Sequence, residues 1–262
     1  MKRENIFTGY VQSFLDNLLA EIKQITGDQF VGCYLHGSLA MGSFQPGNSD
    51  IDLLVVLNKA LSTQQKQRLA ALFLSQSKHP YPVEVSFLLA SKLKEEKHPF
   101  SYLFHYSEYW RERMEVDKKQ VTEKSEGHDA DLAAHIAVLL NRGITLEGAP
   151  ADRVFPQIPR ADFISSIQSD YNECLMTYMD KPVYALLNML RFYWYLKEGC
   201  ILSKVEAGER AYEDFPENML PAIQSLLYNY QVQEADKQRI NKQKLTALKN
   251  LIDDKIKELL RQ

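Results

Sequence analysis

The sequence predicts an α+β protein with an N-terminal mixed sheet flanked by helices and a C-terminal bundle of helices. In the first 120 residues, short strand-like apolar runs alternate with stretches of helical periodicity. Beyond the polar, turn-rich segment 117–127, the strand-like runs stop and apolar residues recur at helical spacing. We therefore expect two domains, residues 1–120 and 128–262, joined by this segment.

The N-terminal elements begin with an amphipathic helix, because apolar residues recur at helical spacing from Phe7 to Ile25. Gly27 follows where a C-terminal cap is expected. The apolar run 30–35 then predicts the first strand.

A Gly-Ser loop and an Asp-x-Asp strand follow, and the rest of the chain is organised around them. The loop opens with Gly37 and Ser38 and closes with a turn cluster that ends at Ser49. Since side chains alternate along a strand, Asp50 and Asp52 project from one face. Two carboxylates at the start of a strand are typical of a Mg²⁺ site, because Mg²⁺ binds one or two carboxylates together with substrate phosphates.

The alternative for these aspartates is a solvent-facing position on an edge strand. The run 53–57 argues against it, because it is apolar without alternation and so predicts a strand buried on both faces. Unpaired carboxylates at the entry of a buried strand are costly, and a bound cation would offset that cost.

The next two elements are a helix that begins at Ser62, with Gln65 completing a capping box, and a strand over residues 83–89. Glu84 stands among strand formers and shares a face with Ser86. If this strand lies beside the Asp-x-Asp strand, Glu84 converges on the aspartates. The alternative is the exposed face of an edge strand.

The segment 98–114 is rich in aromatic residues, which at this density are more often core or interface than ligand platform. Trp110 nevertheless lies between Glu108 and Glu112, and such a trio could hold a cationic, sugar-like substrate.

The C-terminal half is read as successive helices over residues 131–141, 161–179, 183–197 and 235–260. The third is apolar on most sides and should be central, so Arg191 within it needs an anionic partner, either a phosphate or a structural carboxylate. Ser203 and Glu206 form a capping box that makes Lys204 the first helical residue. A lysine there opposes the helix dipole unless it reaches a phosphate, although a solvated surface lysine is the commoner case.

Composition excludes several function classes. The chain has 262 residues and a net charge of −3, without the basic excess typical of nucleic-acid binding. Its three cysteines are far apart, and the sequence has no Cys-x-x-Cys or His-Glu-x-x-His spacing that would indicate zinc. No apolar run approaches the length of a membrane span. We expect a cytoplasmic monomer that binds neither nucleic acid nor membranes.

These motifs together resemble the nucleotidyltransferase superfamily. Gly37-Ser38, the Asp50-Ile51-Asp52 strand and the later Glu84 occur in the order typical of that superfamily. With Trp110, the 129–133 segment and Lys204, the chain is similar to the streptomycin/spectinomycin adenylyltransferases over nearly its whole length. The resemblance implies an N-terminal polymerase-beta-like nucleotidyltransferase domain and a C-terminal helical domain that closes over ATP and substrate.

The resemblance also implies roles for individual residues. Asp50 and Asp52 would bind Mg²⁺, two ions in all, and Glu84 would be the catalytic base that meets the acceptor hydroxyl. The positions implied for the ATP phosphates are Gly37, Ser38, Ser49, Arg191 and Lys204. Those implied for the acceptor pocket are Trp110, Glu108 and Asp180.

The implied reaction is transfer of AMP from ATP to a hydroxyl of an aminoglycoside-type antibiotic. The family commonly has Gly-Glu-Trp where this chain has Ser-Glu-Tyr-Trp at 107–110. Streptomycin-modifying members carry a Trp and an Asp before the helix with Arg191, whereas residues 172–180 contain no Trp and only a loose match at Asp180. Spectinomycin is therefore favoured over streptomycin. The alternatives are another small-molecule or protein acceptor, and a non-catalytic regulatory module.

Overall fold

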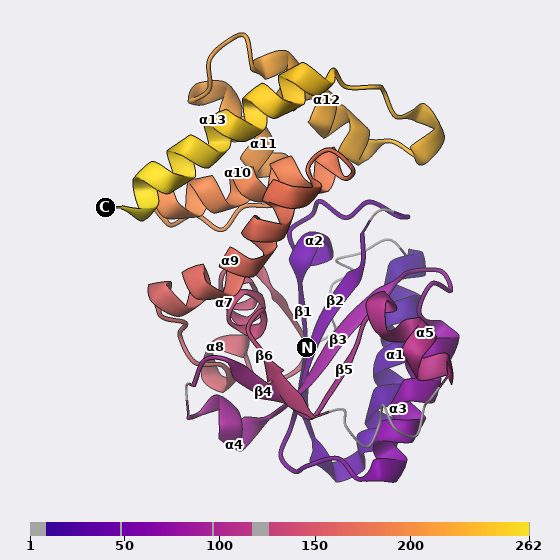
Figure 1. The fold of residues 1–262 in the computed structure, drawn as a ribbon. Coiled ribbons are helices and arrows are strands. Elements are labelled where there is room, and N and C mark those ends of the chain that lie inside the picture. Colours follow the sequence, from indigo (N-terminus) through magenta and orange to yellow (C-terminus); the bar gives the residue numbers. More distant parts are fainter. Residues whose placement is uncertain (1–8, 48, 96, 117–125, 262) are drawn as a thin grey trace. The chain divides into compact units, whose positions relative to one another are not determined.

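The computed structural model describes residues 9–47, 49–95, 97–116 and 126–261 (Figure 1). The described residues form two compact units that interleave along the chain. The sheet unit draws on the described residues within 9–36, 50–130 and 143–157, and the helical unit on those within 37–49, 131–142 and 158–261. This division differs from one boundary near residue 120, because the Gly-Ser loop groups with the helices and residues 143–157 return to the sheet. Residues 117–125 of the expected linker lie outside the described residues.

The sheet unit is built on five strands in the order β5-β3-β2-β1-β7. The strands are β1 (Phe30–His36), β2 (Ile51–Leu57), β3 (Val83–Leu89), β5 (Phe104–Tyr106) and β7 (Ile144–Gly148). β2 and β3 are parallel, whereas β1 pairs antiparallel with β2 and β7, and β5 pairs antiparallel with β3. The predicted mixed sheet is confirmed, but the expectation that strands stop after residue 127 is wrong, because β7 pairs with β1.

The central position of β2 explains its sequence. Every residue from Leu53 to Leu57 is at most 2% exposed, as predicted for a strand covered on both faces. β3 has β2 on one side and β5 on the other, so Glu84 does not lie on an edge strand. The edge-strand alternative for Glu84 is therefore wrong.

The helices α1 (Gly9–Thr26), α3 (Thr63–Gln76) and α5 (Arg111–Val116) lie on one side of this sheet (Figure 1). The other helical elements of the unit are α4 (Ala90–Leu93), α8 (Ala151–Val154), and the 3₁₀ turns η1 (Gly27–Gln29) and η2 (Glu108–Trp110). The capping box of Ser62 and Gln65 is present at the start of α3. Phe7 lies outside the described residues, and α1 begins at Gly9.

Phe73 of α3 packs on one face of the five-stranded sheet, which is therefore its apolar face. The Phe73 ring lies 6.2 Å from that of Phe87 and 5.4 Å from that of Tyr106. Because strand side chains alternate, Glu84 and Ser86 lie on the opposite face. A two-stranded ribbon of β4 (Phe100–Tyr102) and β6 (Gly127–Asp129) lies on that other side, away from α1 and α3 (Figure 1).

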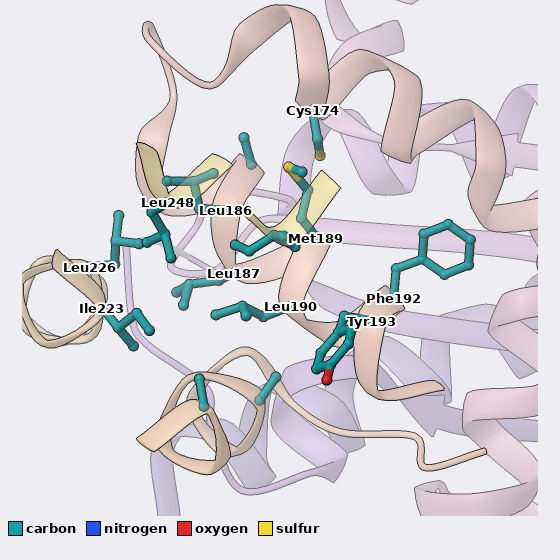
Figure 2. Packing of buried hydrophobic residues seen from close by; sticks show 14 of the residues in the cluster. Cys174, Leu186, Leu187, Met189, Leu190, Phe192, Tyr193, Ile223, Leu226 and Leu248 are labelled. Carbon is teal, nitrogen blue, oxygen red and sulfur yellow. The ribbon is translucent and has the colours of Figure 1, made fainter. Parts of the chain in front are cut away.

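The helical unit is organised around α10, as its all-round apolar sequence predicts. Its helical elements are α2 (Gly37–Ala40), α7 (Leu132–Arg142), α9 (Arg160–Thr177), α10 (Pro182–Glu198), α11 (Lys204–Arg210), η3 (Ala211–Glu213), α12 (Leu220–Gln231), η4 (Glu234–Asp236) and α13 (Lys242–Leu260). α10 contacts α9, α11, α12 and α13. Figure 2 shows its leucines meeting Ile223 and Leu226 of α12 and Leu248 of α13.

Helix boundaries in this unit follow local capping. α10 ends at Gly199, which has φ of 72° in the left-handed region that favours glycine. The last helix begins at Lys242 rather than near Ala235, because Asn241 caps it through the backbone N–H groups of Gln243 and Lys244. Within the described part of the chain, no helix is long and apolar enough to cross a membrane.

Candidate active site

The predicted carboxylates meet on one face of the sheet. Asp52 of β2 lies opposite Glu84 of β3 in the parallel register, and opposite His36 of β1 in the antiparallel register. Directly opposed residues project from the same face, so these three side chains form one row across three strands. Asp50 precedes β2 by one residue and is exposed. The structure therefore brings Asp52 and Glu84 together, as the sequence predicts.

Glu84 lies in an acidic environment. Burial raises the pKa of its carboxyl, nearby His105 lowers it, and Asp50 and Asp129 raise it again, with a net upward shift. Like charges disfavour ionisation of a neighbouring carboxyl, and so does removal from water. A raised pKa is suited to a general base, because it makes the carboxylate a better proton acceptor.

Asp129 and His105 are site residues whose function was not predicted from the sequence. Asp129 ends β6, and its charge raises the pKa of the Glu84 carboxyl. His105 lies in β5 opposite Ser86. The sequence offers one signal for His105, which is that it is a polar residue within the aromatic segment 98–114. The position of Asp129 depends on pairing of β6 with β4, which no local pattern indicates.

The donor chemistry of the aspartates fits Mg²⁺. Among the residues that the structure describes, no group of three or more His, Cys, Asp or Glu side chains is arranged to hold a metal ion. A cation at Asp50 and Asp52 would therefore complete its coordination with phosphate and water oxygens, which is the usual arrangement for Mg²⁺.

The Gly-Ser loop is held in a compact turn. Gly37 has φ of 66°, a left-handed conformation that favours glycine. The Ser43 amide donates to the Ser38 carbonyl at 2.9 Å, and the Gln45 amide donates to the Ser49 hydroxyl at 3.2 Å. The two serines predicted to contact phosphate thus open and close one folded loop.

Tyr230 of α12 ties this loop to Lys204. Its hydroxyl lies 3.5 Å from the Ser49 hydroxyl and donates to the Ser43 carbonyl at 3.3 Å. The Lys204 ammonium lies 5.9 Å from the centre of the Tyr230 ring and 4.9 Å from that of Tyr184. The structure therefore brings Ser49 and Lys204 together through a tyrosine that the sequence did not single out, since its spacing in α12 is that of a core residue.

Arg191 braces the segment before α11. Its Nε donates to the Leu202 carbonyl at 2.8 Å, and its Nη1 donates to the Asn188 side chain at 3.1 Å. The arginine is half-buried, and these two partners are neutral rather than anionic. The guanidinium thus fixes the backbone two residues before Lys204.

Glu108 is separated from Glu84. Its carboxylate accepts hydrogen bonds from Arg111, Ser77 and Tyr106, and it pairs with Lys78. Tyr106 lies on the face that packs on α3, opposite the face of Glu84. The structure therefore does not group the Glu108 carboxylate with that of Glu84. Glu108 stabilises the end of α3 instead.

The other two expected pocket residues belong to different units, Trp110 to the sheet unit and Asp180 to the helical unit. The Trp110 ring packs against its neighbour Tyr109 at 5.4 Å and lies 5.4 Å from the guanidinium of Arg113. Asp180 is exposed in the turn between α9 and α10, and its amide donates to the Thr177 carbonyl.

Two family models match the chain in the order of its two halves. A nucleotidyltransferase domain matches residues 15–114, and the C-terminal domain of aminoglycoside adenylyltransferase matches residues 153–255. A spectinomycin 9-adenylyltransferase of Staphylococcus aureus is 26% identical over 239 residues, which cover 89% of this chain and 90% of that protein. Both halves of the chain are thus similar to those of the aminoglycoside adenylyltransferases. The chain is therefore a nucleotidyltransferase, as the carboxylate pattern predicts.

Two further comparisons extend the similarity. The spectinomycin 9-adenylyltransferase of Enterococcus faecalis is 25% identical over 210 residues, covering 76% of this chain and 81% of that protein. The solved structure of the E. faecalis spectinomycin adenyltransferase AAD(9), with ATP and spectinomycin, has a TM-score of 0.76 and 20% identity, and covers 94% of this chain and 99% of that one. The predicted adenylyltransferase fold is confirmed.

Proposed function

We propose that this enzyme transfers AMP from ATP to a hydroxyl of spectinomycin or a closely similar aminoglycoside-type antibiotic, in the cytoplasm, and releases pyrophosphate. The observation that carries the proposal is the register of Asp52 with Glu84 on adjacent parallel strands, with Asp50 close enough to raise the pKa of Glu84. The S. aureus and E. faecalis relatives are named for adenylylation of spectinomycin, which supports this acceptor over streptomycin.

Glu84 is the base in this proposal. Its carboxylate takes the proton of the acceptor hydroxyl, and the oxygen attacks the α-phosphorus of ATP. The bond from that phosphorus to the bridging oxygen breaks, and the electron pair leaves with pyrophosphate. The half-buried, acidic surroundings of Glu84 raise its proton affinity, which favours this transfer.

Asp50 and Asp52 would hold Mg²⁺, which neutralises phosphate charge when bound. Their carboxylates alone would repel the triphosphate, and a pair of carboxylates with phosphate oxygens is a common Mg²⁺ ligand set.

Lys204, Arg191 and the Gly-Ser loop would bind the phosphates. Ser38 and Ser49 supply hydroxyls and Gly37 permits the turn that presents them. Lys204 is held near Ser49 by Tyr230, so a cation and a hydroxyl donor are available together. Arg191 acts by its charge and by fixing the backbone before Lys204. Trp110 and Asp180 remain the proposed acceptor contacts, whereas Glu108 is committed to its own ion pairs.

The test is pyrophosphate release from ATP with spectinomycin, streptomycin and a lincosamide, with and without Mg²⁺. We expect release with spectinomycin that requires Mg²⁺ and falls about 100-fold or more in Glu84→Gln, the scale of a lost general base. Glu95→Gln, at an exposed glutamate paired with Lys92, is the matched control and should retain activity.

Each other result would change the proposal in a specific way. Release with a different acceptor, still lost in Glu84→Gln, would keep the reaction and replace the substrate. ATP binding without release for any acceptor would favour a regulatory nucleotide-binding module. Full activity of Glu84→Gln would remove Glu84 as the base.

A further inference from the structure

His105 is a histidine built into the same face of the sheet as Glu84. It lies in β5 opposite Ser86 of β3, and Ser86 is two residues along the strand from Glu84. Residues two apart on a strand share a face, and diagonal neighbours on adjacent strands are within reach of long side chains. We propose that His105 is a positioning residue that holds the Glu84 carboxylate in place for proton transfer. This inference rests on the proposed role of Glu84 as the base.

The imidazole is itself fixed by its neighbours. Its Nδ1 lies 2.9 Å from the Ser86 hydroxyl, and Ser86 is only 2% exposed. On the ribbon side, the ring of Tyr102 lies 5.9 Å from the imidazole, at a tilt of 56°. A ring held by a buried hydroxyl and beside an aromatic ring has few rotamers, so it offers a constant partner to Glu84.

The charges around Glu84 give the histidine its function. Asp129 repels the ionised Glu84 carboxylate. His105 is the neighbour that acts in the opposite direction. An attractive partner on the side of β5 draws the carboxylate toward His105 and restricts its rotation. Because the imidazole is held by Ser86 and lies beside Tyr102, it attracts the Glu84 carboxylate from one constant direction and favours one orientation of the base.

The test is a double-mutant cycle of His105→Leu and Glu84→Gln, with pyrophosphate release and adenylylated product measured at saturating ATP and spectinomycin. We expect His105→Leu to lower kcat about 10- to 100-fold, the range seen when a residue that orients a functional ligand is lost. The KM for ATP should stay within about 2-fold, because a positioning residue for the base acts on the chemical step. The double variant should be no slower than Glu84→Gln alone, because His105 has no carboxylate to orient once Glu84 is replaced.

Three further variants separate positioning from folding. His105→Gln keeps a hydrogen-bonding side chain and should recover most of kcat. Ser86→Ala frees the imidazole and should lower kcat without a matching change in KM. His79→Leu, at an exposed histidine of the same unit, should leave both parameters unchanged. All variants are compared by thermal unfolding.

Two results would overturn the inference while the proposed function stands: unchanged kcat in His105→Leu with an inactive Glu84→Gln, or a double variant much slower than Glu84→Gln. The second result would mean that His105 supports the fold rather than the base. Full activity in Glu84→Gln would overturn both the inference and the role of Glu84.

Discussion

At the scale of single residues, the two glutamates Glu84 and Glu108 have opposite pKa shifts although both are half-buried. Burial raises the pKa of each carboxyl. At Glu84, Asp50 and Asp129 add to that effect, whereas His105 offsets part of it. At Glu108, hydrogen bonds from Arg111, Ser77, Lys78 and Tyr106 outweigh burial and hold the pKa at about 2. The environment therefore suits Glu84 to accepting a proton and Glu108 to remaining an ionised structural anchor.

Glu108→Gln should destabilise the protein at pH 7 by about 2–3 kcal/mol, because the stabilised carboxylate is lost. The folded pKa lies below the unfolded one, so this stabilisation is complete above the unfolded value near 4.5. It declines as pH falls toward the folded value of about 2. The difference between wild type and variant, measured by urea unfolding, should therefore be smaller at pH 4 than at pH 7.

Glu112→Gln is the matched control, because Glu112 is exposed in α5, the helix that directly follows the turn with Glu108. It should change the unfolding free energy by less than about 0.5 kcal/mol. A constant difference for Glu108→Gln from pH 7 to pH 4 would contradict the assigned ion pairs.

At the scale of elements, α11 positions Lys204 through contacts at both of its ends. Ser203 and Glu206 form the predicted capping box, and Glu206 also pairs with Arg142 of α7 at 3.0 Å. Toward the other end, Gly208 lies against Leu227 of α12. A short helix has little stability of its own, so these tertiary contacts set its position.

Gly208→Ala should destabilise the protein by about 1–2 kcal/mol. A methyl group there would lie 2.6 Å from Leu227 Cδ2 and 3.3 Å from Leu187 Cδ2. Overpacking of this kind costs about 1–3 kcal/mol, against a gain of up to about 1 kcal/mol from better helix propensity. Gly9→Ala is the control, since among the described residues no neighbouring atom lies within 4 Å of the added carbon. Thermal unfolding should show opposite signs for the two variants, and a stabilised Gly208→Ala would refute the packing argument.

At the scale of the whole molecule, each unit is assembled from separated pieces of the chain. β7 pairs with β1, more than 100 residues earlier, over the register pairs that run from Gly32 with Gly148 to Leu35 with Ile144. The Tyr34 hydroxyl donates to the Ala149 carbonyl at 3.0 Å, and its ring packs on Phe155 at 4.9 Å. A cut at the apparent domain boundary therefore removes part of the sheet.

A fragment of residues 1–130 should aggregate, because loss of β7 makes β1 an edge strand whose backbone groups are paired on one side only. A matched fragment of residues 1–157, with 131–142 replaced by a Gly-Ser linker of equal length, keeps β7 and should stay monomeric with a cooperative unfolding transition. Size-exclusion chromatography and circular dichroism would compare the two. Equal behaviour would mean that β7 contributes nothing to the sheet.

The sequence by itself determined the features that depend on a few neighbouring residues. The unalternating run after Asp52 predicted a buried strand, the two capping boxes predicted helix starts, and Glu84 stood out as a carboxylate among strand formers. These signals are local because side-chain alternation, caps and turns act within one or two turns of the chain.

Only the tertiary structure decided which distant residues share a site. The strand order placed Glu84 between two strands and His105 beside it, and the fold of α12 placed Tyr230 against Ser49, 181 residues away. It also separated Glu108 from Glu84 on opposite faces of one sheet. Packing and strand register over the whole chain determine which distant segments become neighbours. Local propensity does not determine which segment pairs with a given strand or packs on a given helix.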